Sequence, residues 1–402
     1  MTFLECSEKY LERKKRRKKI KHKTVLFYKN HFIRITQYFG ERPIESWTTE
    51  DIDLFLDFLE EDHCQTPASA VSANLPSYIY RQKHTRASVA QAAKLSVTTV
   101  ENAAKGKSVS IKSADKIAAV LGMPTEELFV ITDRGNPLSD KSISEHFHTV
   151  NMILKYAVKM GFLERNPCDR AEPPAHEEVE VNYFQPETAR KILAALKQED
   201  LKWQAYVQLL AVGGMRRGEV AGLQWENVFL DEGVIKIRDC LLYSPEKGLY
   251  IDSPKNKKTR WINIPQQTIE LLREYKKWYS ENKEKHAAVW QAVWEQKRET
   301  EMEKLHGKDF LFCNTQTGWP MYPDTLNAWL IRFSERHDLP HLNPHAFRHT
   351  LASILIFEGA DILSIAHRLG HSKPSTTENI YGQIIDMADA MNSKCIANVL
   401  FQ

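Results

Sequence analysis

Apolar side chains recur at helical spacing through the first 62 positions of the chain, which predicts amphipathic helices there. One such helix covers residues 27–38 and is expected to end at Gly40. The sequence Thr48-Thr49-Glu50-Asp51 is typical of a capped helix start, and apolar positions follow it through 52–59. Helical spacing returns in residues 138–163.

The second half of the chain mixes two periodicities. Residues 186–196 and 202–213 have helical spacing, whereas 234–238, about 248–251 and 261–264 alternate like short strands. Glycine and Ser-Pro turns separate these strands, which predicts a small antiparallel sheet, and helical patterns fill the remainder. The fold class we expect is mainly α with a small antiparallel β-sheet.

Breaks in these patterns divide the chain into domains. Residues 63–74, 133–137 and 172–178 have linker composition. We expect a helical domain split into residues 1–65 and 136–172, with an all-α domain inserted at 75–132. An α+β domain with a C-terminal tail follows at 180–402. A chain of 402 residues is too long for one hydrophobic core, which agrees with this division.

Composition narrows the class of protein. The hydrophobic fraction of 42% and the charged fraction of 27% are ordinary for a soluble globular protein. No apolar run approaches the roughly 20 residues of a membrane helix, and the first residues lack the pattern of a secretion signal. The six cysteines have no zinc-site spacing, so reduced and mostly buried thiols are expected. These features predict a cytoplasmic protein without membrane contact.

Charge is unevenly distributed, although the net charge is only +3. Residues 1–42 carry thirteen Lys/Arg and four Asp/Glu, whereas residues 43–62 carry eight acidic residues and no basic one. The candidates for contact with a DNA backbone lie in a run of seven consecutive cations: Arg13, Lys14, Lys15, Arg16, Arg17, Lys18 and Lys19. A solvated face or a frayed tail explains this run equally well.

Short basic boxes follow in the second half, and each is weak evidence by itself. Gly213-Gly214-Met215-Arg216 places a planar guanidinium, which suits a phosphate, beside an irregular backbone. The cationic stretch Ser253–Arg260 lies between two strand-like runs and is expected to be a hairpin tip. Its Lys255 is placed to deliver a proton. Ordinary surface turns are the competing and, for each box alone, the favoured interpretation.

Histidine and tyrosine complete the series. His345-Ala346-Phe347-Arg348-His349 places two imidazoles and a guanidinium on one helical face, and burying them unpaired would be costly. A metal site competes for the two histidines, but no carboxylate or cysteine stands at fitting spacing. Farther on, Gly370 ends an amphipathic helix, His371 follows it, and Tyr381 falls in a short helix.

In this order and at this spacing, the boxes resemble the tyrosine recombinase (phage integrase) family. They are Gly-Met-Arg-x-Gly-Glu, Pro-Lys, His-x-x-Arg-His, Leu-Gly-His and a Tyr ten residues beyond that last His. The likeness covers about residues 183–385, and residues 1–62 with 138–163 resemble that family's helical core-binding domain more loosely. The resemblance implies an enzyme that cuts and rejoins DNA through a 3′-phosphotyrosine.

The resemblance also implies the main catalytic roles. Arg216 and Arg348 would clamp the scissile phosphate and offset charge in the transition state. Lys255 would be the general acid that protonates the 5′-hydroxyl leaving group. Tyr381 would attack phosphorus.

Four further residues match positions that support this chemistry. His345 would assist proton transfer, and His371 would donate a hydrogen bond. Glu219 and His349 would support the site. Cations can stabilise the oxyanion of a tyrosine, whose unperturbed pKa is near 10, without a metal ion. We therefore expect no cofactor and no metal, and the chain has no Walker motif.

The insert has a resemblance of its own. Residues 89–100 look like the helix-turn-helix of phage-repressor-type domains, except that Lys94 occupies the turn position where those domains usually have Gly. If the insert binds DNA, the helix at about 96–104 would enter the major groove. The candidates for contact are Ser96, Thr98, Thr99 and Asn102. A module that binds protein, such as a partner subunit, is the alternative.

The favoured function is site-specific recombination of duplex DNA by an integrase or excisionase-type transposase of a mobile element. The alternatives are a transcriptional regulator that keeps the fold without the chemistry, and a type IB topoisomerase or hairpin telomere resolvase. The family implies double-stranded DNA attachment sites as partners, a homotetramer on two duplexes, and an accessory directionality factor as a further candidate. The tail 382–402 is expected to pack as an amphipathic helix on a neighbour or on its own domain.

Overall fold

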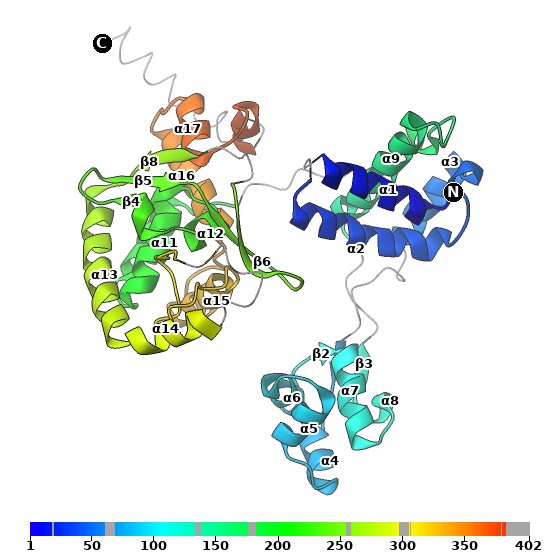
Figure 1. Cartoon of the computed structure of the whole chain (residues 1–402), viewed down its shortest axis with the longest axis horizontal. Helices are drawn as coiled ribbons and strands as arrows, with labels where there is room; N and C mark the ends of the chain where they lie inside the picture. Colours follow the sequence, from blue (N-terminus) through cyan, green and yellow to red (C-terminus); the bar gives the residue numbers. More distant parts are fainter. Residues whose placement is uncertain are drawn as a thin grey trace. The chain divides into compact units, whose positions relative to one another are not determined.

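The structure, a computed structural model, describes residues 1–17, 20–60, 69–132, 138–175, 182–254, 259–296, 305, 307–378 and 380–382. The chain divides into two compact units, Met1–Glu178 and Val179–Gln402. Figure 1 shows their helices and strands coloured along the sequence. No helix in the described ranges is long and apolar enough to cross a membrane.

One core of the first unit is built by helices from two separate stretches of sequence. These helices are α1 (Phe3–Arg16), α2 (His22–Phe39), α3 (Thr49–Glu60) and α9 (Asp140–Lys159). Thr2 and Glu5 form a capping box that starts α1, and Gly40 ends α2 with φ at 57°. Helix α9 packs against the other three, although the insert separates it from them in sequence. Residues from both predicted halves, 1–65 and 136–172, thus share a core.

The insert is closed by a small sheet of its own. Strand β1 (Ser69–Val71) pairs antiparallel with both β2 (Val109–Ser110) and β3 (Val130–Thr132). Between them lie α4 (Leu75–Arg81), α5 (Arg86–Ala93), α6 (Val97–Ala104), α7 (Ile111–Leu121) and α8 (Thr125–Leu128). Our prediction that residues 69–71 belong to a linker was wrong, because their backbone groups pair in this sheet.

The second unit is organised around a helix that is buried on most sides. This is α11 (Leu201–Gly213), which packs against α10 (Pro186–Leu196), α12 (Arg217–Ala221), α13 (Gln266–Lys285) and α16 (Pro344–Phe357). Its apolar residues point all round, as expected of a core helix. Figure 1 shows α13 running alongside α11. Further helices of this unit include α14 (Ala287–Gln296), α15 (Thr325–Arg336) and α17 (Ile362–Leu369).

The strands of this unit form two small antiparallel sheets. One has the order β4 (Val228–Phe229), β5 (Val234–Ile237), β8 (Arg260–Asn263), and the other pairs β6 (Cys240–Ser244) with β7 (Gly248–Asp252). The predicted fold class, mainly α with a small antiparallel sheet, is confirmed. The predicted hairpin at Ser253–Arg260 is wrong, because β7 pairs with β6 whereas β8 pairs with β5. The sequence around Lys255 therefore connects two sheets.

Candidate active site

The first predicted arginine lies where α11 ends and α12 begins. Gly214 ends α11 at φ 59°, and a Cβ there would come within 2.8 Å of Leu369, so this turn requires glycine. Arg216 is the N-cap of α12. Its backbone N–H donates to Glu219 Oε2 at 2.9 Å, and its Nη1 donates to Oε1 at 3.0 Å. The turn thus fixes the direction of the Arg216 side chain.

Glu219 is the buried centre of an arginine cluster. Its side chain has no exposed surface, and Arg260 from β8 binds it through Nη1 at 3.1 Å and Nη2 at 2.6 Å. Burial acts to raise the pKa of Glu219, but the hydrogen bonds and charge of Arg260 and the charge of Arg216 outweigh it. The pKa of this carboxyl is therefore lowered. Glu219 stays ionised and holds two guanidinium groups in place.

Arg348, on α16, is 3% exposed. Its Nη1 donates to the carbonyl of Gly214 at 2.6 Å, while its Nη2 has no hydrogen-bond partner among the described residues. Burial, followed by the charge of Arg216, lowers the pKa of Arg348 to about 9, so the group is still a cation at neutral pH. A buried cation with an unpaired donor favours an anionic ligand.

Two predicted histidines adjoin these arginines. Asn343 caps α16, which places His345 in its first turn. Burial and then the charges of Arg348 and Arg216 lower the pKa of His345. His371 follows α17, its Nδ1 is hydrogen-bonded to Thr377 at 2.8 Å, and the same causes lower its pKa to about 4. Both imidazoles are therefore neutral at pH 7.

Tyr381 is buried rather than presented to solvent. It is 1% exposed and packs with Ala352, Ile356 and Leu369. Its hydroxyl is hydrogen-bonded to His349 Nδ1 at 2.8 Å. Burial raises the pKa of Tyr381 to about 12 although Arg348 acts to lower it. Burial and then the charge of His345 lower the pKa of His349 to about 4, so a neutral imidazole faces the phenol.

Most of the predicted catalytic residues lie close enough together for their charges to act on one another. The charge of Arg348 acts on the pKa of His345, His371 and Tyr381, and Arg216 acts on both histidines. Lys255 lies outside the described residues. Within the described ranges, no three His, Cys, Asp or Glu side chains gather in a way that could hold a metal ion.

The predicted DNA-contact residues belong to the first unit. Lys14, Lys15 and Arg16 form the last turn of α1, Arg17 caps it, and Lys18 and Lys19 lie outside the described residues. The Nζ of Lys14 lies over the Tyr10 ring, 5.2 Å from its centroid. The side chain of this lysine therefore packs along α1.

The predicted contact residues of the insert lie at the start and along one side of α6. Ser96 is its N-cap, and its Oγ accepts from Thr99 N at 3.0 Å and is hydrogen-bonded to Thr99 Oγ1 at 2.7 Å. Thr98 is exposed and Asn102 is half-buried. Ser96 and Thr99 therefore hold the helix start, whereas Thr98 is exposed to solvent.

Sequence reasoning missed Arg260 and Thr377 as parts of the site. Arg260 also donates from Nε to the carbonyl of Arg368 at 3.0 Å, so it ties β8 to α17 as well as to Glu219. A signal for it existed: β8 alternates buried and exposed positions, and Arg260 falls on the buried side. An arginine at a buried position of a strand indicates a buried carboxylate partner.

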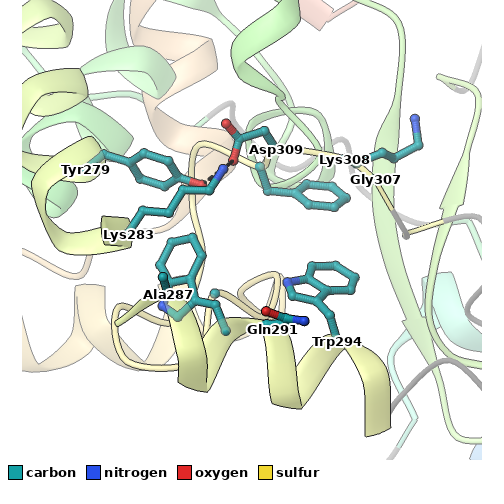
Figure 2. A pocket seen from close by; sticks show the side chains of 11 residues that line it. Tyr279, Lys283, Ala287, Gln291, Trp294, Gly307, Lys308 and Asp309 are labelled. Atoms are coloured by element: carbon teal, nitrogen blue, oxygen red, sulfur yellow. Dashed lines mark hydrogen bonds and ion pairs between the residues drawn. The ribbon is translucent and has the colours of Figure 1, made fainter. Parts of the chain in front are cut away.

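A cavity of about 380 Å³ lies elsewhere in this unit, against α13 and α14. Figure 2 shows Tyr279 and Lys283 directed at the carboxylate of Asp309 on one side of it. They donate to Oδ1 at 2.7 and 2.9 Å. Lys283 is already paired with Asp309, and no predicted catalytic residue lines the cavity. The cavity is therefore a poor site for a DNA phosphate.

Comparison with known proteins decides the family. The model described as the phage integrase family matches residues 182–386, just over half of the chain. The chain belongs to the phage integrase family. The matched segment contains the catalytic residues predicted from the sequence, from Arg216 to Tyr381.

Relatives in this family have names that refer to integration and recombination. The ICEBs1 integrase of Bacillus subtilis (strain 168) is 25% identical over 265 residues, 63% of this chain and 66% of the relative. A XerC-like tyrosine recombinase of Caldanaerobacter subterraneus subsp. tengcongensis is 29% identical over 263 residues, 61% of this chain and 63% of the relative. The chain thus spans less than two thirds of the length of these curated relatives.

Solved structures agree in fold. The Tn1549 transposon integrase, in complex with a circular intermediate DNA, has a TM-score of 0.60 at 18% identity, covering 95% of each chain. The same integrase with transposon right end DNA gives a TM-score of 0.59 at 19% identity. At these identities the match establishes that the phage integrase fold is shared.

Proposed function

We propose that this phage integrase family member is a site-specific DNA recombinase of a mobile element that cuts and rejoins DNA through a 3′-phosphotyrosine. The observation that carries the proposal is the charge balance around Arg348. Arg216 and Arg260 form ion pairs with the buried carboxylate of Glu219, whereas Arg348 is bound only to the Gly214 carbonyl and its Nη2 has no partner among the described residues. A phosphodiester supplies the missing anion and matches the planar donors of guanidinium.

The proposed reaction is a transesterification. The Tyr381 oxygen attacks phosphorus, the bond from phosphorus to the 5′ oxygen breaks, and the phosphodiester is conserved as a 3′-phosphotyrosine. Tyr381 has a pKa of about 12, so it needs help to lose its proton. The neutral His349 lies 2.8 Å from the hydroxyl and can accept that proton, while Arg216 and Arg348 stabilise negative charge on the phosphate. Rejoining reverses these steps and needs no ATP.

The remaining predicted residues take supporting parts in this proposal. Lys255 protonates the 5′ oxygen as it leaves, and His345 and His371 hold the phosphate. Glu219 keeps Arg216 in position through the contacts of 2.9 and 3.0 Å. The reaction as proposed uses no cofactor and no metal ion.

The proposed partner is duplex DNA carrying attachment sites. The Tn1549 integrase structures were solved in complex with DNA, which supports the same kind of partner for this chain. Exposed Lys15, Arg16 and Arg17 at the end of α1 provide a cationic surface for the backbone. Strand exchange between two duplexes requires four copies of the active site, hence a homotetramer, and an accessory factor would set its direction.

The general-acid role of Lys255 gives a sharp prediction. Lys255→Ala should slow cleavage about 10²–10⁴-fold and change DNA affinity little, because it removes a proton donor rather than a phosphate clamp. A DNA substrate with a 5′-bridging sulfur should restore most of the rate, since a thiolate leaves without protonation (thiol pKa about 8.5). Single-turnover cleavage of both substrates measures this.

Lys247→Ala is the matched control for that experiment, because Lys247 lies in the turn between β6 and β7 and is no part of the proposed site. It should leave both rates near wild type. Equal losses of binding and cleavage for Lys255→Ala, or no rescue by sulfur, would reject the role. Relaxation of supercoiled DNA without strand exchange would instead point to a topoisomerase, and tight binding without cleavage to a regulator.

A further inference from the structure

The insert, residues 69–132, has no part in the proposed cleavage chemistry. We propose that it is a second binding site for duplex DNA, formed by α5, α6 and the turn between them. This goes beyond the recombinase proposal, because it assigns a separate site with its own sequence preference.

The insert is built as an independent module. Its buried core, from Ala70 to Phe129, consists of its own residues. Because β1 pairs with β3, with Ser69 opposite Thr132, the two ends of the insert lie side by side. A capping box between Thr85 and Ser88 starts α5, and α5 packs against both α6 and α7. The helix pair is thus a rigid element that can be presented to a groove.

The charges of the insert are segregated along its sequence. Residues 75–107, which contain α4, α5 and α6, carry six Lys/Arg and one Glu. Residues 108–132 carry two Lys and three Asp/Glu. The six cations are all exposed, and none of them forms an ion pair with another described residue: Arg81, Lys83, Arg86, Lys94, Lys105 and Lys107. An unpaired cationic half suits a polyanion.

Two of these lysines have a backbone conformation that residues with a Cβ rarely adopt. Lys83 has φ 55° and Lys94 has φ 52°, in the left-handed region that favours glycine. Lys94 is the C-cap of α5, in the turn that leads to α6. Placing a cation where glycine would relax the backbone gives up stability at the face that would meet phosphates. This trade is typical of a functional position.

The exposed side of α6 can read bases. Thr98, Asn102 and Lys105 are spaced four and three residues apart, so they share a helical face. Thr98 and Lys105 are exposed and Asn102 is half-buried. An asparagine in a major groove can pair with adenine through two hydrogen bonds, and a threonine can contact a base or a phosphate. Ser96 and Thr99, which hold the helix start, are positioning residues in this scheme.

The first test uses a variant that is expected to gain stability and to lose DNA affinity. In the full chain, Lys94→Gly should raise the melting temperature of the insert by a few degrees, because glycine adopts the left-handed backbone conformation without strain. The same variant should bind a pool of random-sequence duplexes several-fold more weakly, with a salt slope smaller by about 0.9. Lys116→Ala, an exposed lysine of α7 next to Asp115, should leave affinity and slope unchanged. Unchanged binding by Lys94→Gly would overturn the proposal.

The second test concerns sequence preference and uses the full chain. Selection from duplexes with randomised centres should enrich two motifs with wild type. Thr98→Ala/Asn102→Ala should enrich only one of them and still form covalent DNA through Tyr381. Deleting 69–132, whose ends already adjoin, should do the same. Identical motifs for all three proteins, with or without a change in self-assembly, would overturn the proposal. If wild type enriches both motifs but forms no covalent complex with DNA, that result would instead contradict the recombinase function.

Discussion

Arg348→Ala should cleave DNA about 10²–10³-fold more slowly than wild type, because it removes a preorganised cation from the transition state. Arg348 is 3% exposed, and one of its terminal nitrogens donates to the carbonyl of Gly214. The other has no partner among the described residues and is available to the phosphate. Single-turnover accumulation of covalent protein–DNA complex measures the loss.

Two companion variants separate catalysis from folding. Arg348→Lys keeps the charge but cannot donate to Gly214 and to a phosphate in the same planar fork, so it should recover only part of the rate. Arg348→Met removes an incompletely paired buried charge, and the free energy of unfolding should therefore not fall. Parallel losses of stability and rate in Arg348→Met, or near wild-type cleavage by Arg348→Ala, would contradict a phosphate-binding role.

The largest expected effect on stability comes from Arg260. Arg260→Met should lower the free energy of unfolding of the second unit by about 3–5 kcal/mol, because it strips Glu219 of a two-point ion pair in a buried setting. Arg273→Met is the matched control. Its pair with Asp231 is 52% and 85% exposed, and its removal should cost at most about 1 kcal/mol. Urea unfolding of the full chain measures both.

The pH dependence of this effect has a definite sign. The pKa of Glu219 is lowered in the folded protein, so the ion pair stabilises the fold above the unfolded carboxyl pKa of about 4.3. That stabilisation is lost as pH falls through the lower folded value. The difference between wild type and Arg260→Met should therefore be greatest at neutral pH and shrink in acid. A difference that stays constant with pH, or a loss no larger than that of Arg273→Met, would show that the pair is not what stabilises this region.

The sequence located those parts of the site that local structure determines. The left-handed Gly214 sets up the N-cap position of Arg216, and Asn343 caps the helix that carries His345 and Arg348. Such features lie within a few residues of each other, so motif and spacing are sufficient to place them. The helices and most strand positions followed from periodicity for the same reason.

Contacts between distant elements could not be predicted in this way. Glu219 and Arg260 are far apart in sequence and meet only because the fold brings β8 close to both α12 and α17, so that Arg260 binds Glu219 and the carbonyl of Arg368. The pairing of β7 with β6 instead of β8 depends on β6, a strand that the alternation did not single out. Strand β1, from Ser69 to Val71, is too short to produce a pattern that differs from a linker.

The proposed bond between Tyr381 and DNA is tested with a nicked duplex that loses the cleaved fragment and so traps the intermediate. DNA flanking the proposed mobile element supplies the site, and wild type is compared with Tyr381→Phe on a denaturing gel. The proposed chemistry predicts a covalent protein–DNA band with wild type and none with Tyr381→Phe. A band of equal strength with Tyr381→Phe would show that another residue attacks phosphorus. No band with wild type, although DNA binding is tight, would contradict cleavage by this chain.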